Sequence, residues 1–350
     1  MDANENRIAE GLRVLEDVAR FVTNDSLLTG RLKGLRHTLR TCITLPGDLS
    51  ARSVEEDVGA VSEESTLRGD LVSVVRANAR RVEEALRVVE EMGKLHPSES
   101  RPPQGASLNV EELKNARLAL YGLEQELVFR LLRRDKANLV RGLYVIIDST
   151  FCGGRGELEV AKAAIAGGAA VLQLRDKQRS KGESLPIAKG LKDLCSEHNV
   201  LFIINDHPDL ALAAGADGVH LGQKDLPVEV ARRILPMDAL VGCSSATAEE
   251  AIQAHADGAD YVAVGSIFPT SSKADTRPAG LETLRKVRDA VALPLVAIGG
   301  ICLDNVGEVM AAGADAVAVI SAVVCAEDVE GAAQELSAMM TESKSMKGEQ

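Results

Sequence analysis

The chain has 350 residues and 45 % of them are hydrophobic, so it is long enough for two domains and for a substantial buried core. The formal net charge of −12 and the absence of tryptophan argue against a nucleic-acid-binding surface. No apolar run of about 18 residues, no signal peptide and no C-x-x-C pair occurs, so we expect a cytoplasmic protein without a membrane span, a disulfide framework or a zinc site.

The first predicted domain covers residues 1–136 and is all-helical. Apolar residues recur at helical spacing along its first segment: Ile8, Leu12, Leu15, Ala19 and Val22. The same kind of pattern predicts further helices near residues 28–43, 67–95 and 109–134. Proline, serine and glycine are concentrated in residues 96–105, which we interpret as a loop.

An internal repeat connects the first of these helices with the third. The pattern A-N-x-x-R-x-x-E-x-L-R-V-x-E begins at Ala3 and again at Ala77, an offset of 74 residues. We expect the two helices to pack about a pseudo-two-fold axis. Arginine–glutamate pairs three residues apart would stabilise a solvated helix face by roughly a few tenths of a kcal/mol each. The spacing favours this interpretation, but the recurrence of a poor helix former at Asn4 and Asn78 leaves open a polar pocket between the helices.

The pattern changes to alternating strands and helices from about residue 141, so the second predicted domain covers residues 137–350. Strands are predicted at residues 143–148, 171–175, 201–205, 217–221, 240–244, 261–267, 295–299 and 316–320, and a last helix at 328–342. Corners that contain glycine precede the second, fourth, sixth and eighth strands. Glycine suits a left-handed helix C-cap, so it would end the preceding helix, and a short turn would then lead into the strand.

Eight such βα units in about 200 residues predict an α/β protein in which a (β/α)8 TIM barrel follows the all-helical domain. A doubly wound open sheet is the alternative fold. It is weakened because no G-x-G-x-x-G pattern follows the first strand.

Two of the predicted strands lead into aspartates. Asp206 follows the third strand and Asp225 follows the fourth, with one helix-sized segment between them. The carboxyl ends of barrel strands carry the chemistry in this fold, so both carboxylates are expected at one end of the barrel. Each aspartate could instead cap the helix that follows it, before Pro208 and Pro227 respectively.

Cations and hydroxyls follow the other strands and favour a binding site over two separate caps. Mg2+ binds few carboxylates and keeps positions for water and phosphate oxygens, which Asp206 and Asp225 suit. The cations that would neutralise the rest of a diphosphate are Arg175, Lys177 and Lys273. A separate monophosphate would bind to backbone N–H groups at residues 299–300 and 320–321, after the last two strands. The sequence therefore predicts two phosphorylated small-molecule substrates and a transfer reaction.

As a set, the strand-end motifs resemble those of the thiamine-phosphate synthase family. The motifs are Q-L-R-D-K (173–177), N-D (205–206), H-L-G-Q-K-D (220–225), G-x-S (242–244), P-T-S-S-K-A-D-T (269–276), I-G-G-I (298–301) and V-I-S (319–321). The resemblance implies a (β/α)8 transferase of thiamine biosynthesis, of the class that transfers alkyl or aryl groups. Such an enzyme joins 4-amino-2-methyl-5-(diphosphooxymethyl)pyrimidine to hydroxyethylthiazole phosphate carboxylate or its decarboxylated form, and it releases thiamine phosphate and diphosphate.

The resemblance also implies a role for each motif residue. Mg2+ would be bound by Asp206 and Asp225. The pyrimidine diphosphate would contact Gln173, Leu174, Arg175, Asp176, Lys177, Asn205, His220, Ser244 and Lys273, of which Arg175, Lys177, Ser244 and Lys273 would be catalytic. The thiazole phosphate would contact Thr270, Ser271, Ser272, Gly300, Ile320 and Ser321. The implied mechanism is dissociative: diphosphate leaves, the thiazole nitrogen traps the cation, and the protein neutralises charge and positions the reactants.

One position departs from the family pattern. The family often reads G-x-S-x-H-T where this chain has Ala246 in place of the histidine. The related thiazole tautomerases rely on a histidine at that position. Ala246 therefore argues against a tautomerase, which is a less favoured alternative function.

The first half resembles the ThiD2 domain that is found ahead of thiamine-phosphate synthases. The motifs D-A-N-x-N-R-x-x-E-G-L-R-V-x-E-D (2–17) and L-R-H (35–37) carry this likeness. It implies a multifunctional enzyme whose helical half phosphorylates hydroxymethylpyrimidine phosphate to the diphosphate. The candidate residues are Asn4, Arg7, Glu10, Arg13, Arg36, His37, Asn78, Arg81 and Glu84. The alternative is a monofunctional synthase whose helical half is a dimerisation or binding module, which would make the protein a homo-oligomer.

Overall fold

The structure is a computed structural model of the chain that describes residues 2–44, 68–94, 107–270 and 278–348. It divides into two compact units, Met1–Leu132 and Arg133–Gln350. The division falls within helix α4 (Val110–Ala137), four residues before the predicted domain boundary between residues 136 and 137. No helix in these described ranges is long and apolar enough to cross a membrane.

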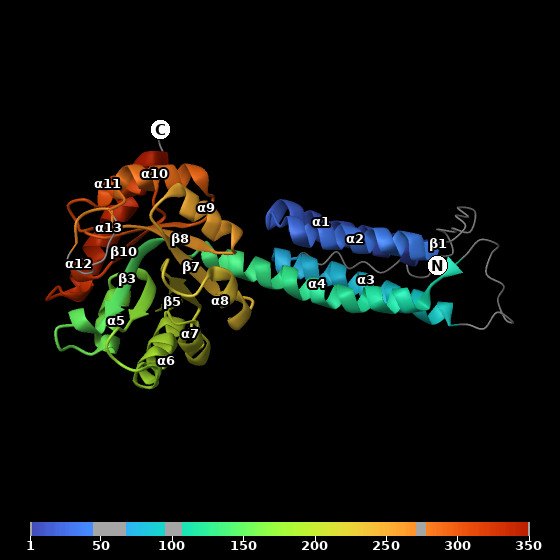
Figure 1. The fold of residues 1–350 in the computed structure, drawn as a ribbon, viewed down its shortest axis with the longest axis horizontal. Helices are drawn as coiled ribbons and strands as arrows, with labels where there is room; N and C mark the ends of the chain where they lie inside the picture. Colours follow the sequence, from blue (N-terminus) through green and yellow to red (C-terminus); the bar gives the residue numbers. More distant parts are fainter. Residues whose placement is uncertain (1, 45–67, 95–106, 271–277, 349–350) are drawn as a thin grey trace. The chain divides into compact units, whose positions relative to one another are not determined.

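The first unit is helical, as the periodicity predicts (Figure 1). Its helices are α1 (Asp2–Asp17), which continues as a π-helical turn over Val18–Val22, α2 (Ser26–Cys42), α3 (Leu71–Gly93) and the first part of α4. Two-residue strands β1 (Ile43–Thr44) and β2 (Ser107–Leu108) pair antiparallel. This short pairing was not predicted, because two residues carry no periodicity. The predicted loop at 96–105 lies outside the described residues.

The two helices of the repeat, α1 and α3, pack directly against each other. Gly11 marks their close approach, because a Cβ atom at this position would overlap the side chain of Val82. Leu12 and Leu86 occupy equivalent positions in the repeat, and both are fully buried in the core of this unit. The repeated apolar stripe therefore forms the contact that the sequence predicts.

Residues 133–350 contain a closed barrel of eight parallel strands (Figure 1). The strands are β3 (Gly142–Asp148), β4 (Ala169–Arg175), β5 (Leu201–Asn205), β6 (Gly218–Leu221), β7 (Leu240–Ser245), β8 (Tyr261–Val264), β9 (Leu295–Ile298) and β10 (Ala316–Val319). They pair in sequence order, and β10 closes the barrel against β3, with Val317 opposite Leu143. The predicted (β/α)8 fold is confirmed, and the doubly wound alternative is excluded.

Helices cover the outside of the barrel. They are α5 (Glu157–Ala166), α6 (Lys181–Glu197), α7 (Pro208–Ala214), α8 (Val228–Ile234), α9 (Ala248–Ala256), α10 (Gly280–Ala290), α11 (Val306–Ala311), α12 (Ser321–Val324) and α13 (Val329–Gly348). Side chains alternate along each strand, so one set packs against the helices and the other fills the barrel. In β8, for example, Val262 belongs to the outer core, whereas Tyr261 and Ala263 belong to the inner one.

The predicted glycine corners close the amino-terminal end of the barrel. Gly215, Gly258 and Gly313 have positive φ angles of 66°, 97° and 107°. The aspartate two residues after each glycine accepts a backbone N–H from the preceding strand and pairs with a cation of a covering helix. The three trios are Asp217 with Phe202 and Lys192, Asp260 with Val241 and Arg232, and Asp315 with Leu295 and Arg288. These acids hold the fold together.

Candidate functional site

The two aspartates that follow neighbouring strands meet at the carboxyl-end rim, which we define as the ring of residues just after the barrel strands. β5 and β6 are parallel neighbours, and the carboxyl groups of Asp206 and Asp225 hydrogen-bond to each other. The backbone of Asp206 has a left-handed φ of 62°, and its N–H donates to the His220 carbonyl at 2.8 Å. The predicted juxtaposition of the two carboxyl groups is therefore present.

Neither aspartate caps the helix that follows it. The N-cap of α7 is His207 and the N-cap of α8 is Pro227, and neither makes a side-chain capping bond. Asp225 Oδ2 instead accepts the backbone N–H of Gly222 at 2.7 Å within its own loop. The capping alternative is thus excluded for both residues, and their carboxyl groups face each other.

The pKa values of the two aspartates are shifted in opposite directions. Burial opposes the charged form of Asp206, but the hydrogen bond and charge of the Lys177 ammonium outweigh it and lower the pKa of Asp206. Burial and then the hydrogen bond with Asp206 raise the pKa of Asp225. Two carboxylates in contact cannot both ionise easily, so a second positive charge beside Lys177 would stabilise the pair.

The donor set at this position fits a hard divalent cation. Among the described residues, no group of three or more histidine, cysteine, aspartate or glutamate side chains could hold a metal ion. The protein therefore offers two carboxylates here and leaves other coordination positions to water or phosphate oxygens. This composition suits Mg2+, which usually keeps several waters and binds through one or two carboxylates and substrate phosphates.

One further acid at the rim, Asp148, was missed in the sequence. Asp148 ends β3, is fully buried, and forms an ion pair with Arg175 at the end of β4, its register partner. The Thr150 N–H also donates to Asp148 at 3.0 Å. Asp148 follows the first predicted strand, so the same strand-end rule that selects Asp206 would have found it. Its effect is to hold the Arg175 guanidinium at the rim.

A row of hydrogen-bonded polar side chains runs through the barrel interior up to the rim. Gln173 Nε2 donates to the Tyr144 hydroxyl at 2.7 Å, and the Tyr144 and Tyr261 hydroxyls are 3.2 Å apart. Tyr261 Oη lies 3.2 Å from His220 Nδ1, and His220 Nε2 lies 3.0 Å from Ser244 Oγ. Gln173, His220 and Ser244 were predicted site residues, whereas Tyr144 and Tyr261 were not. Their signal is a polar aromatic residue at an inward-facing strand position in a chain that is only 2 % aromatic.

Two predicted contact residues have side chains engaged elsewhere. The Leu174 side chain is buried in the cluster between the strands and the covering helices, so only its backbone could reach a ligand at the rim. The Asp176 carboxylate accepts the backbone N–H groups of Gln178 and Arg179 at 3.0 and 3.1 Å, and the Ser184 hydroxyl at 3.1 Å. Asp176 therefore organises the loop that carries Lys177.

The residues of the predicted second anion site belong to the loops after β8, β9 and β10. The Phe268 N–H donates to the Gly299 carbonyl at 3.0 Å. Gly300 has a φ of 65°, and a Cβ atom there would overlap the Pro269 carbonyl oxygen, so the close approach of these loops requires glycine. Ile320 and Ser321 stand at the start of α12, directly after β10. Thr270 is described, whereas Ser271, Ser272 and Lys273, which follow it directly, lie outside the described residues.

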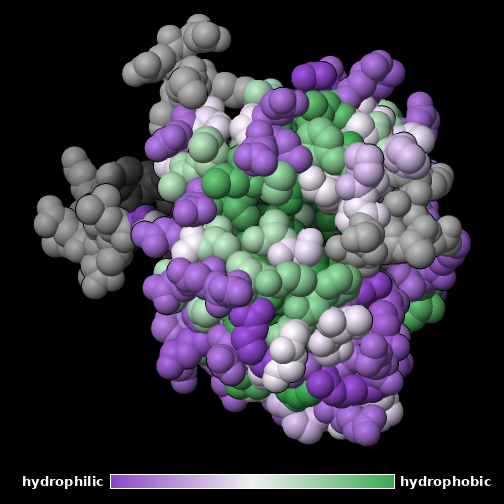
Figure 2. Space-filling model, turned by 90° about the vertical axis from the view of Figure 1, so that its left-hand side faces the viewer, coloured by the Kyte–Doolittle hydropathy of each residue, from purple (hydrophilic) through white to green (hydrophobic). Residues whose placement is uncertain are grey.

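The surface of the carboxyl-end rim has an apolar centre. Helix α12, which follows the carboxyl end of β10, lies at the left of the barrel unit in Figure 1, and Figure 2 looks onto that side. Hydrophobic residues gather at the centre of this face and hydrophilic residues at its margin (Figure 2). Such a surface suits uncharged rings in the middle and phosphate groups at the edge.

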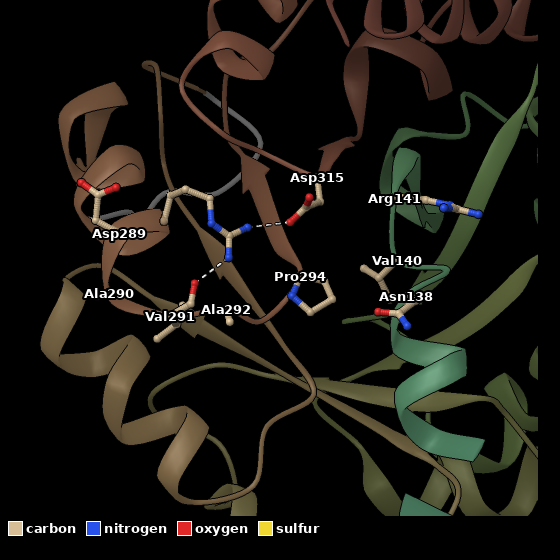
Figure 3. A pocket seen from close by; sticks show the side chains of 10 residues that line it. Asn138, Val140, Arg141, Asp289, Ala290, Val291, Ala292, Pro294 and Asp315 are labelled. Atoms are coloured by element: carbon tan, nitrogen blue, oxygen red, sulfur yellow. Dashed lines mark hydrogen bonds and ion pairs between the residues drawn. The ribbon is translucent and has the colours of Figure 1, made fainter. Parts of the chain in front are cut away.

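A large cavity lies at the other end of the barrel. It has a volume of about 710 Å³ and is lined by residues that precede β3, β9 and β10, including Asn138, Arg141, Pro294 and Asp315 (Figure 3). Arg288, which also lines it, is bound by Asp315 at 2.8 Å and by the Val291 carbonyl at 2.5 Å. The predicted strand-end residues are therefore not in this cavity.

The candidates in the helical unit are dispersed over its surface and core. Arg7, Glu10, Arg13, His37, Arg81 and Glu84 are exposed. Asn4 accepts a hydrogen bond from Arg7 at 3.3 Å, whereas its repeat equivalent Asn78 is buried and donates to the Val74 carbonyl at 2.8 Å in its own helix. The two repeated asparagines thus have different surroundings.

Two glutamates at the end of the repeat, Glu16 and Glu90, were not predicted as site residues, yet both are buried. Each has an arginine three residues earlier, Arg13 at 4.0 Å and Arg87 at 3.1 Å. Each also binds an arginine of another helix, Arg36 at 2.9 Å for Glu16 and Arg117 at 3.1 Å for Glu90. The repeated charges are therefore more than solvated pairs, because each glutamate joins two helices.

A second pair of acids lies between α3 and α4. Burial raises the pKa of Glu83 to about 7, and the neighbouring Glu124 carboxyl group adds to the effect. One oxygen of Glu83 is buried without a hydrogen-bond partner among the described residues. At neutral pH this pair therefore tends to keep one proton.

Comparisons with known proteins cover both units. Residues 143–323 match the Thiamine monophosphate synthase family, and residues 1–126 match the ThiD2 family. A thiamine-phosphate synthase of Thermosynechococcus vestitus is 41 % identical over 339 residues, which are 96 % of this chain and 93 % of that protein. Its counterpart in Synechocystis sp. is 40 % identical over 328 residues, which are 93 % of this chain and 90 % of that protein.

Similarity to solved structures covers the barrel part of the chain, and one example is a thiamine phosphate pyrophosphorylase from Pyrococcus furiosus, with 44 % sequence identity and a TM-score of 0.55. The match covers 59 % of this chain and 98 % of that one. The structural similarity therefore extends over that entire protein and part of the present chain.

Proposed function

Because the chain belongs to the thiamine-phosphate synthase family of transferases in thiamine biosynthesis, we propose that its barrel joins a pyrimidine diphosphate to a thiazole phosphate in a Mg2+-dependent reaction. The substrates are 4-amino-2-methyl-5-(diphosphooxymethyl)pyrimidine and hydroxyethylthiazole phosphate carboxylate or its decarboxylated form. The products are thiamine phosphate and diphosphate. The observation that carries the proposal is the contact between Asp206 and Asp225 beside Lys177 at the carboxyl-end rim.

Asp206 and Asp225 would hold Mg2+, which when bound supplies positive charge to the diphosphate leaving group. The contact of the two carboxyl groups supports this assignment: burial, and then the hydrogen bond with Asp206, raise the pKa of Asp225, and a bound cation would favour the charged form of both. Lys177 lies beside the pair and would add a further positive charge next to the same phosphates. Among the described residues, Arg175 is the other predicted cation of this site.

The protein residues around the leaving group act mainly by charge and position. Arg175 is held at the rim by the buried carboxylate of Asp148, so its guanidinium is oriented before diphosphate arrives. Ser244 is bound to His220 and can contribute a hydroxyl at the same place. Fixed donors that face a developing negative charge are worth about 100- to 1,000-fold in rate when one is removed.

Recognition of the two ring systems is assigned to the remaining motif residues. Gln173 lies two residues before the end of β4 and Asn205 ends β5, and their amides would hold the aminopyrimidine. The thiazole phosphate would bind in the loops after β8, β9 and β10, at Thr270, Ser271, Ser272, Gly300, Ile320 and Ser321. The close approach of these loops at Gly299 and Gly300 supports a site built largely from backbone N–H groups.

For the helical unit we propose phosphorylation of hydroxymethylpyrimidine phosphate, which would supply the substrate of the barrel. The match to the ThiD2 family over residues 1–126 supports this activity. The second candidate is a non-catalytic dimerisation or binding module. The observation that favours it is that the buried glutamates Glu16 and Glu90 each form ion pairs with two arginines. Charges that are paired in this way stabilise the helices and are not left for a substrate.

The synthase proposal is tested by mixing the full chain with Mg2+, the pyrimidine diphosphate and the thiazole phosphate. We expect stoichiometric thiamine phosphate and diphosphate, and loss of the reaction when Mg2+ is chelated. Asp206→Asn should abolish most of the rate. Asp193→Asn, which changes an exposed aspartate on α6, is the matched control and should react normally. Absence of thiamine phosphate from the unmodified protein would refute the proposal.

The kinase proposal needs a separate experiment with the same full chain. The pyrimidine monophosphate and ATP replace the pyrimidine diphosphate, and thiamine phosphate is measured again. If product forms from the diphosphate but not from the monophosphate with ATP, the helical unit does not phosphorylate under these conditions, and the binding-module candidate is preferred.

A further inference from the structure

The row of hydrogen bonds inside the barrel has a preferred direction of donation, from Gln173 toward His220. The Gln173 amide N–H donates to the Tyr144 hydroxyl, which still has one hydrogen to donate. Tyr144 can give that hydrogen to Tyr261, and Tyr261 can then give its own to His220 Nδ1. In the opposite direction, with the Gln173 amide oriented N–H toward Tyr144 as in the structure, the hydrogen of Tyr144 would have no acceptor among the hydrogen bonds of the described residues. The forward direction is therefore preferred.

The forward direction determines where the histidine carries its proton. His220 Nδ1 becomes an acceptor, so a neutral imidazole has its hydrogen on Nε2, which is 3.0 Å from Ser244 Oγ. Ser244 then accepts from His220 and can donate its own hydroxyl hydrogen outward. Burial raises the pKa values of both Tyr144 and Tyr261, so these hydroxyls stay protonated and able to donate.

Packing keeps the five side chains in place. Tyr261 is fully buried, its ring stacks on His220 with centroids 5.5 Å apart, and it lies 6.4 Å from the Tyr144 ring. A Cβ atom at Gly242 would overlap the Tyr261 ring. The glycine of the G-x-S motif therefore makes room for the tyrosine, two residues before Ser244 on the same strand.

We propose that Tyr144 and Tyr261 are positioning residues that hold His220 in its Nε2-protonated form and thereby direct the Ser244 hydroxyl hydrogen toward the leaving diphosphate. This inference rests on the proposed function, in which Ser244 contacts the diphosphate. Gln173 starts the row with its amide N–H and offers its amide oxygen to the amino group of the pyrimidine. The row thus connects recognition of the ring to the leaving group of the same substrate.

The first test is made without substrate and does not depend on any activity. Nitrogen-15 NMR of the full chain, with His220 assigned through a His220→Gln variant, reports which ring nitrogen carries the proton in the neutral form. We expect protonated Nε2 in the unmodified protein and a rise of the Nδ1-protonated form in Tyr261→Phe. Tyr121→Phe, at an exposed tyrosine, is the matched control and should leave the signal unchanged. Protonated Nδ1 in the unmodified protein would overturn the proposal.

The second test separates positioning from a general structural role by kinetics. Tyr261→Phe should lower kcat by about 10-fold, the effect of one lost hydrogen bond at the upper end of the usual range, with little change in KM. In a Ser244→Ala background the same change should cause no further loss, because the residue it positions is gone. Equal losses in both backgrounds would reject the role. If the unmodified protein makes no thiamine phosphate, the proposed function fails, whereas the NMR result still stands alone.

Discussion

The two ends of the barrel use aspartates in opposite ways. At the amino-terminal end, Asp217, Asp260 and Asp315 each accept a backbone N–H and pair with a cation of a covering helix. At the carboxyl-end rim, the carboxyl groups of Asp206 and Asp225 hydrogen-bond to each other beside Lys177, and burial and this hydrogen bond raise the pKa of Asp225. Acids that pair with cations hold the fold, whereas the acids that face each other are the ones that we propose to bind a ligand.

Cavity size does not reveal this difference. The cavity of about 710 Å³ lies at the amino-terminal end, where Arg288 and Asp315 already neutralise each other. The facing acids lie at the carboxyl-end rim, which is the end that carries the active site in (β/α)8 barrels generally, and this is where we propose the site. The arrangement of charge is thus a better indicator of the site than its volume.

The largest expected effect comes from the facing acids. Asp206→Asn and Asp225→Asn should each lower the synthase rate by about 100- to 1,000-fold, because the charge that neutralises the leaving group is lost with its ligand. Mg2+ should raise the melting temperature of the unmodified protein but not of these variants. A normal rate in either variant, measured at saturating Mg2+, would contradict the assignment.

An aspartate at the amino-terminal end of the barrel should affect stability and leave the synthase rate nearly unchanged. Asp260→Asn leaves Arg232 buried without its counter-charge, so the free energy of unfolding should fall by about 3 kcal/mol. The synthase rate of the remaining folded protein should stay within about two-fold, because this end does not touch substrate. Denaturant titration and kinetics together check this expectation. A stable but inactive variant would erase the distinction between the two ends.

Asp148 tests whether an acid that is paired with a cation can still contribute to the activity proposed for the rim. Asp148→Asn removes the charge that holds Arg175, and we expect about a 10-fold lower kcat, since a charge-assisted hydrogen bond is worth about 1.5 kcal/mol or more. In an Arg175→Ala background the same substitution should add little. Additive losses would show that Asp148 acts independently of Arg175.

The smallest expected effect is a change in stability at Glu83, which contacts Glu124 in the helical unit as Asp206 contacts Asp225 in the barrel. Burial raises the pKa of Glu83 from 4.5 to about 7, so the folded chain binds more protons than the unfolded chain between these pH values. Stability contributed by this group is therefore complete below about pH 4.5 and is lost as the pH rises through about 7. Glu83→Gln should stabilise the protein at pH 8 by about 1 kcal/mol, a value reduced for partial exposure.

Denaturant titrations at pH 5 and pH 8 provide the measurement for Glu83. The stabilisation by Glu83→Gln should be present at pH 8 and nearly absent at pH 5. Glu84→Gln, at the exposed neighbouring glutamate, is the control and should show no such difference. A pH-independent effect of Glu83→Gln would mean that the pair does not share a proton.

Much of this architecture could be predicted because it depends on local patterns. A short apolar run such as Tyr261–Val264 identifies a strand, and glycine at positions such as Gly215 identifies the corner before the next one. The strand-end rule then places Asp206 and Asp225 at one end of the barrel without any coordinates. Asp148 follows the same rule and could have been found, whereas the second arginine bound to Glu90 could not, because Arg117 belongs to another helix.

The sequence by itself thus determined the barrel, the helical repeat and the set of polar residues at the strand ends, because periodicity and chain order specify them. Tertiary structure alone decided which of these groups touch. Tyr144 and Tyr261 are separated by 117 residues, yet they share a hydrogen bond in the barrel interior. The burial and the contact between the two rim carboxyls, which together raise the pKa of Asp225, likewise exist only once the strands are closed. Contacts between distant residues depend on side-chain direction and distance, which a linear pattern does not contain.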